Sequence, residues 1–265
     1  MLISTAFAPN QEMLALAREL TDLFAGHYIE RRKHSITKLF ALGKVSGLSA
    51  NRLLIVEKND LKLYEETQPG QAFFFHPSMA ALRIGRLQRG EPDPLVEISQ
   101  LRPGESFLDC TLGIGSDTLV AAYALGPAGQ VLALESDQAL ATIVGRALRV
   151  GDKLAAKISA NLAPIEVVNA DYNDFLPTLA DRSFDVVYFD PMFKEPVAES
   201  VAFEPLRAFA NPAELNERAI AEARRIARKR VILKAEKGSS LFTSYGFKEA
   251  RRSADFSYGV IELAD

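Results

Sequence analysis

The sequence predicts an α/β fold with a mostly parallel sheet, and three observations support this prediction. Short apolar runs alternate with helix-like segments from about residue 106 to residue 235, as expected when helices cover both faces of a parallel sheet. The run Phe184–Phe189 is apolar on both faces, as a central strand requires. Runs around Tyr245–Phe247 and Tyr258–Leu263 then predict an antiparallel strand pair near the C-terminus.

The composition is typical of a soluble protein with a large core. Hydrophobic residues make up 48% of the 265 residues, and the formal net charge is -3, so no global charge predicts a polyanion-binding surface. The single cysteine, Cys110, excludes an internal disulfide framework and indicates a cytoplasmic protein. No apolar run reaches membrane-spanning length, and the three histidines and one cysteine have no metal-site spacing, so we expect no membrane and no metal.

The chain divides into a small α+β module at residues 1–90 and a main domain at residues 91–265, with the break at Gly90-Glu-Pro-Asp-Pro94. The alternative is that the last helix of the module, with its three arginines, packs against the sheet of the main domain. In the module we expect a strand at 2–8, a helix at 11–25 capped by Asn10, a hairpin of 52–57 with 61–65, an extended aromatic run at 72–76 and a helix at 78–88. In the main domain we expect helices at 94–101 (capped by Asp93), 116–125, 137–150, 173–179 (or a turn) and 212–227, and strands at 106–110, 130–135, 165–169, 184–189 and 230–235.

The loop after Phe107-Leu-Asp109 carries the first functional signal. Gly113 and Gly115 lead from this strand into the helix that opens at Ser116, where backbone N–H groups and the positive end of a helix dipole face a ligand. Such a pair of glycines is a weak signal by itself, and a purely structural turn is the alternative. The strand that follows ends in Glu135, at the position where an acid commonly binds ribose hydroxyls.

The residues around the loop favour a nucleoside ligand without phosphates. Thr118 stands where a dinucleotide fingerprint has a third glycine or alanine. Asp109 and Asp117 would repel a phosphate, yet they suit a ligand that carries an amine and a sulfonium. S-adenosylmethionine fits this description, and we predict it as the cofactor.

Four predicted strands end in acids, namely Asp109, Glu135, Asp171 and Asp190. Ligands of open α/β sheets bind outside the carboxyl ends of the strands, so we expect these side chains to line one cleft. Glu135 is assigned to the ribose, and Asp171, with Tyr172 or Asn173, to the adenine amino group. A helix cap is the alternative role for Asp171. The full set predicted to bind the cofactor is Asp109, Thr111, Gly113, Gly115, Asp117, Thr118, Glu135, Ser136, Asp171, Tyr172 and Asp190.

The most specific motif is Asp190-Pro-Met-Phe193, directly after a hydrophobic strand. Its carboxylate and a backbone carbonyl are two acceptors that suit the hydrogens of an exocyclic amine, and an aromatic ring can stack on an unpaired base. Two acceptors would orient the nitrogen lone pair toward the methyl group, and orientation lowers the barrier. We therefore predict catalytic roles for Asp190, Pro191 and Phe193. A rigid turn with a buried Phe193 is the structural alternative.

The chain resembles class I S-adenosylmethionine-dependent methyltransferases and, among them, the RsmJ-type family. Leu108–Asp117, Leu134-Glu135 and Asp190–Phe193 carry the resemblance, and the segment from Met79 to Gly90 adds to it. The resemblance implies a Rossmann-like fold and methylation of the 2-amino group of a guanine in small-subunit ribosomal RNA. The chain departs from the family pattern at Ser116, where arginine is usual.

An RNA partner would need basic contacts. The candidates are Arg31, Arg32, Lys33, Arg83, Arg86, Arg89 and Lys194. For the segment around Arg31 a solvated loop is an equal alternative. Two other functions stay open at this point: methylation of a small molecule or a protein amide, and a non-catalytic nucleotide-binding protein.

Overall fold

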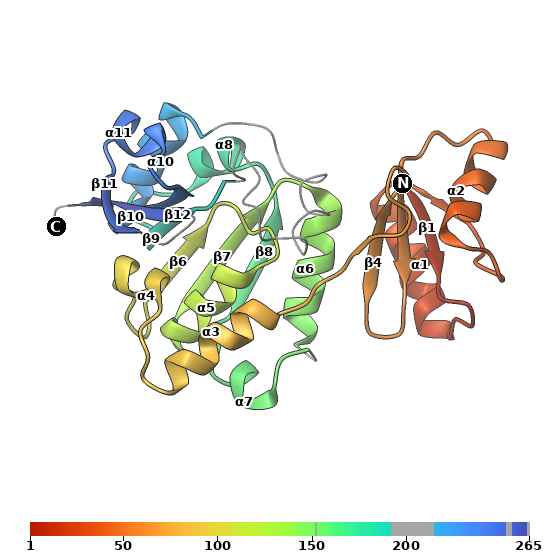
Figure 1. Ribbon diagram of the computed structural model, residues 1–265, viewed down its shortest axis with the longest axis horizontal. Coiled ribbons are helices and arrows are strands. Elements are labelled where there is room, and N and C mark those ends of the chain that lie inside the picture. Colours follow the sequence, from red (N-terminus) through yellow and green to blue (C-terminus); the bar gives the residue numbers. More distant parts are fainter. Residues whose placement is uncertain (152, 192–214, 253–255, 264–265) are drawn as a thin grey trace. The chain divides into compact units, whose positions relative to one another are not determined.

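The computed structural model describes residues 1–151, 153–191, 215–252 and 256–263. It divides into two compact units, Met1–Phe75 and His76–Asp265, which are coloured red to orange and yellow to blue in Figure 1. This division falls before the boundary near residue 90 that the sequence predicts. The reason is that helix α3 (Ser78–Gln88) packs against α5 (Ser116–Leu125) and so belongs to the second unit.

The first unit is a five-stranded sheet with two helices. Its strands lie in the order β2-β1-β3-β4-β5, where β1 pairs in parallel with β2 and β3, and the predicted hairpin of β3 and β4 is confirmed. Leu2, Leu39, Phe40, Leu53 and Ile55 form one cluster of its buried core. The elements are β1 (Leu2–Thr5), α1 (Gln11–Leu23), β2 (His27–Tyr28), α2 (Ile36–Val45), β3 (Arg52–Val56), β4 (Leu61–Glu65) and β5 (Ala72–Phe73).

Helix α2 is an element that the sequence analysis did not predict. The Ser35 side chain caps it by accepting a hydrogen bond from the backbone N–H of Lys38. The basic residues before it are typical of a solvated loop, whereas the buried pair Leu39 and Phe40 faces the core. The basic residues Arg31, Arg32 and Lys33 therefore lie in a loop, and this loop ends where α2 begins.

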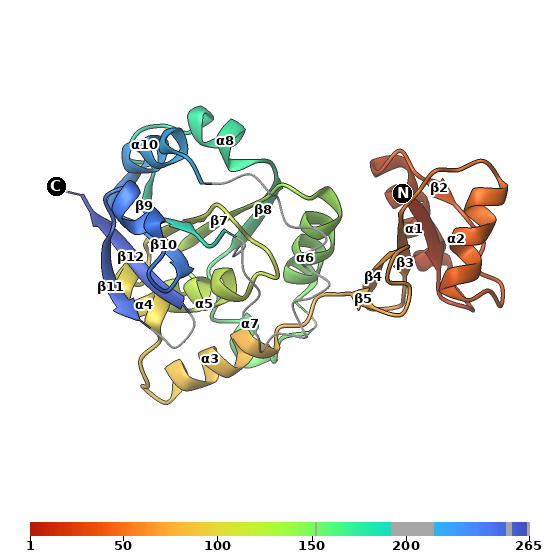
Figure 2. The same cartoon turned by 45° about the horizontal axis from the view of Figure 1, so that its top comes forward.

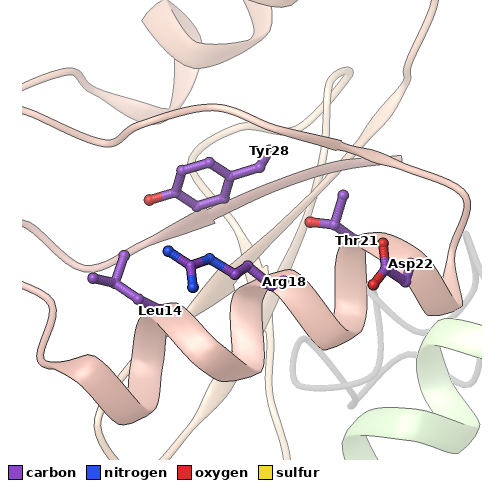
Figure 3. A pocket seen from close by; sticks show the side chains of 5 residues that line it. All are labelled: Leu14, Arg18, Thr21, Asp22 and Tyr28. Carbon is purple, nitrogen blue, oxygen red and sulfur yellow. The ribbon is translucent and has the colours of Figure 1, made fainter.

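A hollow of about 260 Å³ lies between α1 and β2 of this unit (Figure 3). Leu14, Arg18, Thr21, Asp22 and Tyr28 line it. Arg18 and Asp22 carry opposite charges, so their formal charges cancel. The hollow therefore lacks the concentrated positive charge that a phosphate site requires.

The second unit is built on a seven-stranded sheet in the order β11-β12-β10-β9-β6-β7-β8. Strands β8, β7, β6, β9 and β10 are parallel, and β12 runs antiparallel to β10 and β11, which confirms the predicted mostly parallel sheet with an antiparallel C-terminal pair. The elements are α3, α4 (Pro94–Ser99), β6 (Ser106–Asp109), α5, β7 (Gln130–Glu135), α6 (Gln138–Val150), α7 (Ala156–Ser159), β8 (Ile165–Asn169), α8 (Tyr172–Phe175), the 3₁₀ turn Leu176–Thr178, β9 (Phe184–Phe189), α10 (Glu217–Ile226), β10 (Ala227–Glu236), α11 (Ser240–Ser244), β11 (Lys248–Arg252) and β12 (Phe256–Glu262).

The boundaries differ from the predicted ones in two places. Strand β11 starts at Lys248, after the predicted run at Tyr245–Phe247, because Phe242–Gly246 form the end of α11 and the turn that follows it. The described part of the helix predicted at 212–227 is α10, and residues 212–214 lie outside the described residues.

Helices cover both faces of the sheet, as Figures 1 and 2 show. Alternate strand residues pack under α4 and α5 on one face, including Phe107, Val186 and Ile232. The residues between them, such as Leu108 and Val187, pack on the other face with α8 and α10. Within the described residues, each helix is too short or too polar to cross a membrane.

The order of the strands places a switch point between β6 and β9. From β6 the chain proceeds outward through β7 to β8, and it then returns to β9 on the other side of β6. In such sheets ligands bind at the carboxyl ends of the two strands that flank the reversal. Asp109 ends β6, and Asp190 directly follows β9.

Candidate active site

The four acids predicted at strand ends lie at the carboxyl ends of four adjacent strands. Asp109 and Asp190 flank the switch point, Glu135 ends β7, and Asp171 follows β8. Neighbouring strand ends are joined by hydrogen bonds: Cys110 N–H donates to the Tyr188 carbonyl at 2.9 Å, and Ala170 N–H donates to the Glu135 carbonyl at 3.0 Å. One edge of the sheet therefore carries all four acids.

Asp109 is buried at the start of the glycine loop and holds the loop and the helix together. Its Oδ1 accepts a hydrogen bond from Thr111 N–H at 2.9 Å, and its Oδ2 accepts from Thr118 Oγ1 at 2.5 Å. Thr111 Oγ1 in turn accepts from Asp190 N–H at 2.7 Å. Burial raises the pKa of Asp109 to about 7, although the hydrogen bonds from Thr118 and Thr111 oppose this rise.

The glycine loop requires glycine at both expected positions. Gly113 has φ +53° and Gly115 has φ +74°, both in the left-handed region. A Cβ on Gly115 would also lie 3.2 Å from Cγ1 of Val144. Gly115 precedes the first turn of α5, which is the arrangement predicted for a ligand loop at a helix N-terminus.

Glu135 reaches from β7 to the glycine loop. Its Oε2 accepts from Gly113 N–H at 3.1 Å, and its Oε1 accepts from Asp137 N–H at 2.9 Å. Burial raises the pKa of Glu135 to about 7. Each carboxylate oxygen has lone pairs beyond the one used here, so the group suits the two hydroxyls of a ribose. Ser136, beside it, is exposed.

Asp171 has the cap role that the sequence left as its alternative. Its Oδ1 accepts from the backbone N–H of Asn173 at 2.8 Å, which caps α8. A capping carboxylate still has a second oxygen, so the two roles are compatible. The Tyr172 side chain is buried edge-on against Phe189, and burial raises the pKa of its hydroxyl to about 12.

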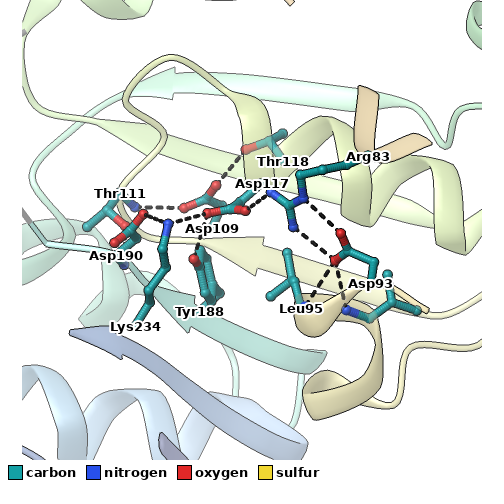
Figure 4. Close-up of polar contacts among 11 residues, drawn as sticks. Arg83, Asp93, Leu95, Asp109, Thr111, Asp117, Thr118, Tyr188, Asp190 and Lys234 are labelled. Atoms are coloured by element: carbon teal, nitrogen blue, oxygen red, sulfur yellow. Dashed lines mark hydrogen bonds and ion pairs between the residues drawn. The ribbon is translucent and has the colours of Figure 1, made fainter. Parts of the chain in front are cut away.

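Five side chains of alternating charge form one connected chain (Figure 4). Arg83 of α3 makes a two-pronged ion pair with Asp93, with Nε to Oδ2 at 2.8 Å and Nη2 to Oδ1 at 2.9 Å, and its Nη1 contacts Asp117 of α5. Lys234 Nζ lies 3.3 Å from Oδ2 of Asp117 and 2.7 Å from Oδ2 of Asp190. The sequence of charges is therefore Asp93, Arg83, Asp117, Lys234, Asp190.

These charges change the pKa values of the groups. Burial by itself would raise the pKa of Asp117, but Lys234 and Arg83 hold it below its usual range. Burial would lower the pKa of Lys234, and Asp117 and Asp190 raise it above its usual range. Burial raises the pKa of Asp190, and Lys234 opposes the rise. Asp117 and Lys234 are thus a charged pair at neutral pH.

The structure places Arg83 differently from the expected phosphate contact. Its side chain is 18% exposed and its guanidinium is bound by two carboxylates, so it belongs to the buried network and not to the surface. Arg86 of the same helix and Arg89, directly after its end, are exposed, as are Arg32 and Lys33. Arg31 lies 4.6 Å from the centre of the Phe7 ring. Phe193 and Lys194 lie outside the described residues.

Lys234 is a site residue that the sequence analysis missed. It stands in the strand Val231-Ile-Leu-Lys-Ala235, among residues that are buried on both faces. A lysine within such a strand must find a buried partner, and this was the available signal. Among the described residues, no group of three or more acids, histidines or cysteines is arranged to hold a metal ion.

The fold and the site together define a class I S-adenosylmethionine-dependent methyltransferase: a Rossmann-like sheet with an antiparallel C-terminal pair, a glycine loop after β6, and acids at four strand ends. The family model described as "Putative SAM-dependent methyltransferase" matches residues 28–247. The chain belongs to this family, and S-adenosylmethionine is its cofactor.

The chain is also similar to the following proteins. The uncharacterized protein YpiP of Bacillus subtilis (strain 168) is 38% identical over 265 residues, which cover 99% of this chain and all of that protein. Ribosomal RNA small subunit methyltransferase J of Hydrogenovibrio crunogenus is 27% identical over 179 residues, so the match spans 66% of this chain and 63% of that protein. The crystal structure of the SAM-dependent methyltransferase NGO1261 from Neisseria gonorrhoeae has a TM-score of 0.62 and 18% identity, and the match covers 99% and 96% of the two chains.

Proposed function

We propose that this methyltransferase modifies an exocyclic amino group of an RNA base, and that the base is a guanine in small-subunit ribosomal RNA. The observation that carries the proposal is the position of Asp190-Pro191 directly after β9, at the switch point beside Asp109. The likeness to ribosomal RNA small subunit methyltransferase J over 179 residues supports the choice of RNA.

The described residues suit an amine acceptor. Lys234 Nζ donates to Oδ2 of Asp190, and the backbone N–H of Asp190 donates to Oγ1 of Thr111. With both groups fixed, Oδ1 of Asp190 would accept a hydrogen bond from the amine and orient the nitrogen lone pair. The cofactor supplies an electrophilic methyl group on its sulfonium, and Glu135 and Asp171 would hold the ribose and the adenine.

Basic side chains on the surface would contact the RNA backbone. Arg86 lies on the exposed side of α3, Arg89 is exposed directly after this helix, and Arg32 and Lys33 are exposed in the first unit. Arg89 and Arg32 each pair with a neighbouring glutamate, at 2.7 Å and 3.1 Å, but surface pairs of this kind contribute little and are exchanged readily for a phosphate. Arg83, which is bound in the network, is left out of this set.

The direct test is methyl transfer to ribosomal RNA. The wild-type chain should transfer labelled methyl groups to naked small-subunit RNA or to the small ribosomal subunit, and digestion to nucleosides should yield 2-methylguanosine. Asp190→Asn should lose at least about two orders of magnitude in kcat, because positioning of the amine contributes that much to catalysis. Glu217→Gln, an exposed acid in α10, is the matched control and should keep full activity.

A binding titration separates RNA from the other acceptors. RNA affinity should fall steeply between low and high salt. Replacing Arg86 and Arg89 with glutamine should reduce the slope by about one for each phosphate that is no longer neutralised. Affinity that does not depend on salt, together with no labelled RNA, would contradict the proposal and direct attention to small molecules and protein amides.

A further inference from the structure

Lys234 occupies its position because of the register of two central strands. β9 and β10 pair in parallel, with Ile232 opposite Tyr188 and Leu233 opposite Phe189. One step further, Lys234 comes opposite Asp190. Because side chains alternate between faces, Lys234 lies on the same face as Ile232, and Asp190 lies on the same face as Tyr188. Both side chains therefore point to the face covered by α5, from which Asp117 projects.

The ammonium of Lys234 connects the two sides of the site. Its Nζ is 2.7 Å from Asp190, on the side of the acceptor, and 3.3 Å from Asp117, next to the glycine loop on the side of the cofactor. The ring of Phe256 covers it with the centroid 5.0 Å away. The Lys234 side chain is 18% exposed, so these two carboxylates and this ring, and not bulk water, stabilise most of its charge.

We propose that Lys234 is a positioning residue for methyl transfer: it keeps the Asp190 carboxylate ionised and oriented toward the acceptor, and it links this carboxylate to Asp117 on the cofactor side. The acceptor role of Asp190 rests on the proposed function. The link between Lys234 and the state of Asp190 rests on the contacts alone.

The charges around Asp190 explain why a cation is needed there. Asp117 and Asp109 face it from α5 and β6, and both disfavour a further negative charge. Three further groups interact with Asp190. They are the hydroxyls of Tyr188 in β9 and Tyr258 in β12, and the guanidinium of Arg83 in α3, which contacts Asp117. Lys234 makes the strongest favourable interaction with Asp190 in this group. Without it a buried carboxylate beside two others takes up a proton, and one of its oxygens then stops being an acceptor.

The titration of Asp190 tests this link without any acceptor. Carbon-13 NMR of a chain labelled at its aspartate carboxyls follows each group with pH, and Asp190→Asn identifies the signal of Asp190. Lys234→Met should raise the pKa of Asp190 by about 1 to 3 pH units, the effect expected for loss of an opposite charge at this distance. Lys234→Arg should leave it near the wild-type value. An unchanged pKa in Lys234→Met would overturn the proposal.

Lys229 provides the matched control. It stands on the same strand and pairs with Glu105 and Asp185, far along β10 from Asp190. Lys229→Met should leave the Asp190 signal unchanged. If Lys234→Met does not fold, Lys234→Gln replaces it, and the same rise is expected. A nitrogen-15 spectrum of the lysine ammonium groups tests the same contact without a substitution at Lys234. One lysine signal of the wild-type spectrum should shift in Asp190→Asn. Absence of any such shift would also overturn the proposal.

Kinetics then connects the titration to catalysis. In Lys234→Met the acidic limb of the pH profile of kcat should move to higher pH together with the Asp190 pKa. At pH 7 the kcat of this variant should be at least about tenfold below that of the wild type. Lys234→Arg should restore most of the lost kcat. A loss of activity at all pH values with no shift of the limb would contradict the positioning role. If the wild-type chain methylates no ribosomal RNA while the Asp190 pKa responds to Lys234 as expected, the proposed function fails and the link stands.

Discussion

The backbone N–H of Asp190 donates a hydrogen bond to Oγ1 of Thr111 at 2.7 Å, so a side chain that follows β6 fixes the first residue after β9. Thr111 N–H also donates to Asp109 at 2.9 Å. The two strand ends at the switch point are thus fastened to one another through a single threonine. The geometry of the Asp190-Pro191 turn depends on this hydroxyl.

Replacing Thr111 with valine should therefore damage catalysis more than binding. The valine removes the acceptor for Asp190 N–H, which costs about 1–3 kcal/mol for an unsatisfied buried group. We expect kcat to fall at least about tenfold while the affinity for S-adenosylmethionine, measured by calorimetry, stays within a few-fold. Thr111→Ser keeps the hydroxyl and serves as the control. A valine variant with wild-type kcat would show that this hydrogen bond does not position Asp190.

Arg83 should contribute mainly to stability. Its guanidinium joins α3 to α4 and α5 through Asp93 and Asp117, and Arg83→Met would leave both carboxylates buried without this cation. Loss of one partner of a buried pair costs about 3–5 kcal/mol. Arg83→Lys should recover only part of this, because lysine cannot reproduce the two-pronged pair.

The control for Arg83 is Arg86, one turn away and exposed. Arg86→Met should change the unfolding free energy by no more than about 0.5 kcal/mol. Denaturant unfolding of the intact chain provides the measurement. Equal stability of the two methionine variants would contradict the structural role of Arg83.

The pKa values of Asp109 and Glu135 predict how stability depends on pH. Both carboxyls have a pKa of about 7 in the folded chain, above the value of about 4 for an unfolded chain, so the folded state binds more protons between these values. Their stabilising contribution is complete below about pH 4 and is lost as the pH rises to about 7. Each group contributes a slope of up to about 1.4 kcal/mol per pH unit.

Asp109→Asn and Glu135→Gln should each flatten this slope in the unfolding free energy between about pH 4.5 and 7.5. The slope is the readout, because each amide also changes the hydrogen bonds at its site. Asp174→Asn, an exposed acid in α8, should leave the slope as it is. A slope that is the same in all three variants and the wild type would contradict the raised pKa values.

The same carboxyls predict how the cofactor is distinguished from its product. S-adenosylmethionine carries a sulfonium that S-adenosylhomocysteine lacks, and a cation favours the ionised form of Asp109. We expect the affinity for S-adenosylmethionine to rise between about pH 6 and pH 8 more steeply than the affinity for S-adenosylhomocysteine. Calorimetry with both ligands measures this, and Asp109→Asn should remove the difference between the two slopes. Parallel slopes in the wild type would contradict it.

The backbone conformation at Gly115 limits which residues this position accepts. Gly115→Ala places a side chain at φ +74°, which costs about 1–2 kcal/mol, and brings its Cβ to 3.2 Å from Val144. In the Val144→Ala background that contact is removed, so the cost of Gly115→Ala should be smaller there. A double-mutant cycle of unfolding free energies measures the coupling. Costs that are equal in both backgrounds would show that the backbone alone requires this glycine.

Local patterns predicted much of this molecule. The caps at Asn10 and Asp93, the β3–β4 hairpin and the acids that end the parallel strands follow from periods of two and 3.6 residues and from side chains that bond to nearby backbone. The antiparallel C-terminal pair was also predictable, although its first strand begins later than expected.

The network could not be predicted in this way, because its partners are far apart in the sequence. Lys234 and Asp117 are 117 positions apart, and Arg83 and Asp117 are 34 positions apart. Only the register of β9 and β10 brings Lys234 beside Asp190. Arg83 looked like one of three surface arginines spaced along a helix, and the sequence does not distinguish the one that turns inward.

The attachment of α3 through Arg83 determines how the catalytic part of the chain can be shortened. A fragment that begins at residue 91 would keep every strand of the seven-stranded sheet and all four acids at the strand ends. Asp93 and Asp117, however, would lose the guanidinium of Arg83 that both contact. Expression of the isolated catalytic unit should therefore begin at His76, so that the helix ahead of the sheet is retained as part of the enzyme's electrostatic framework.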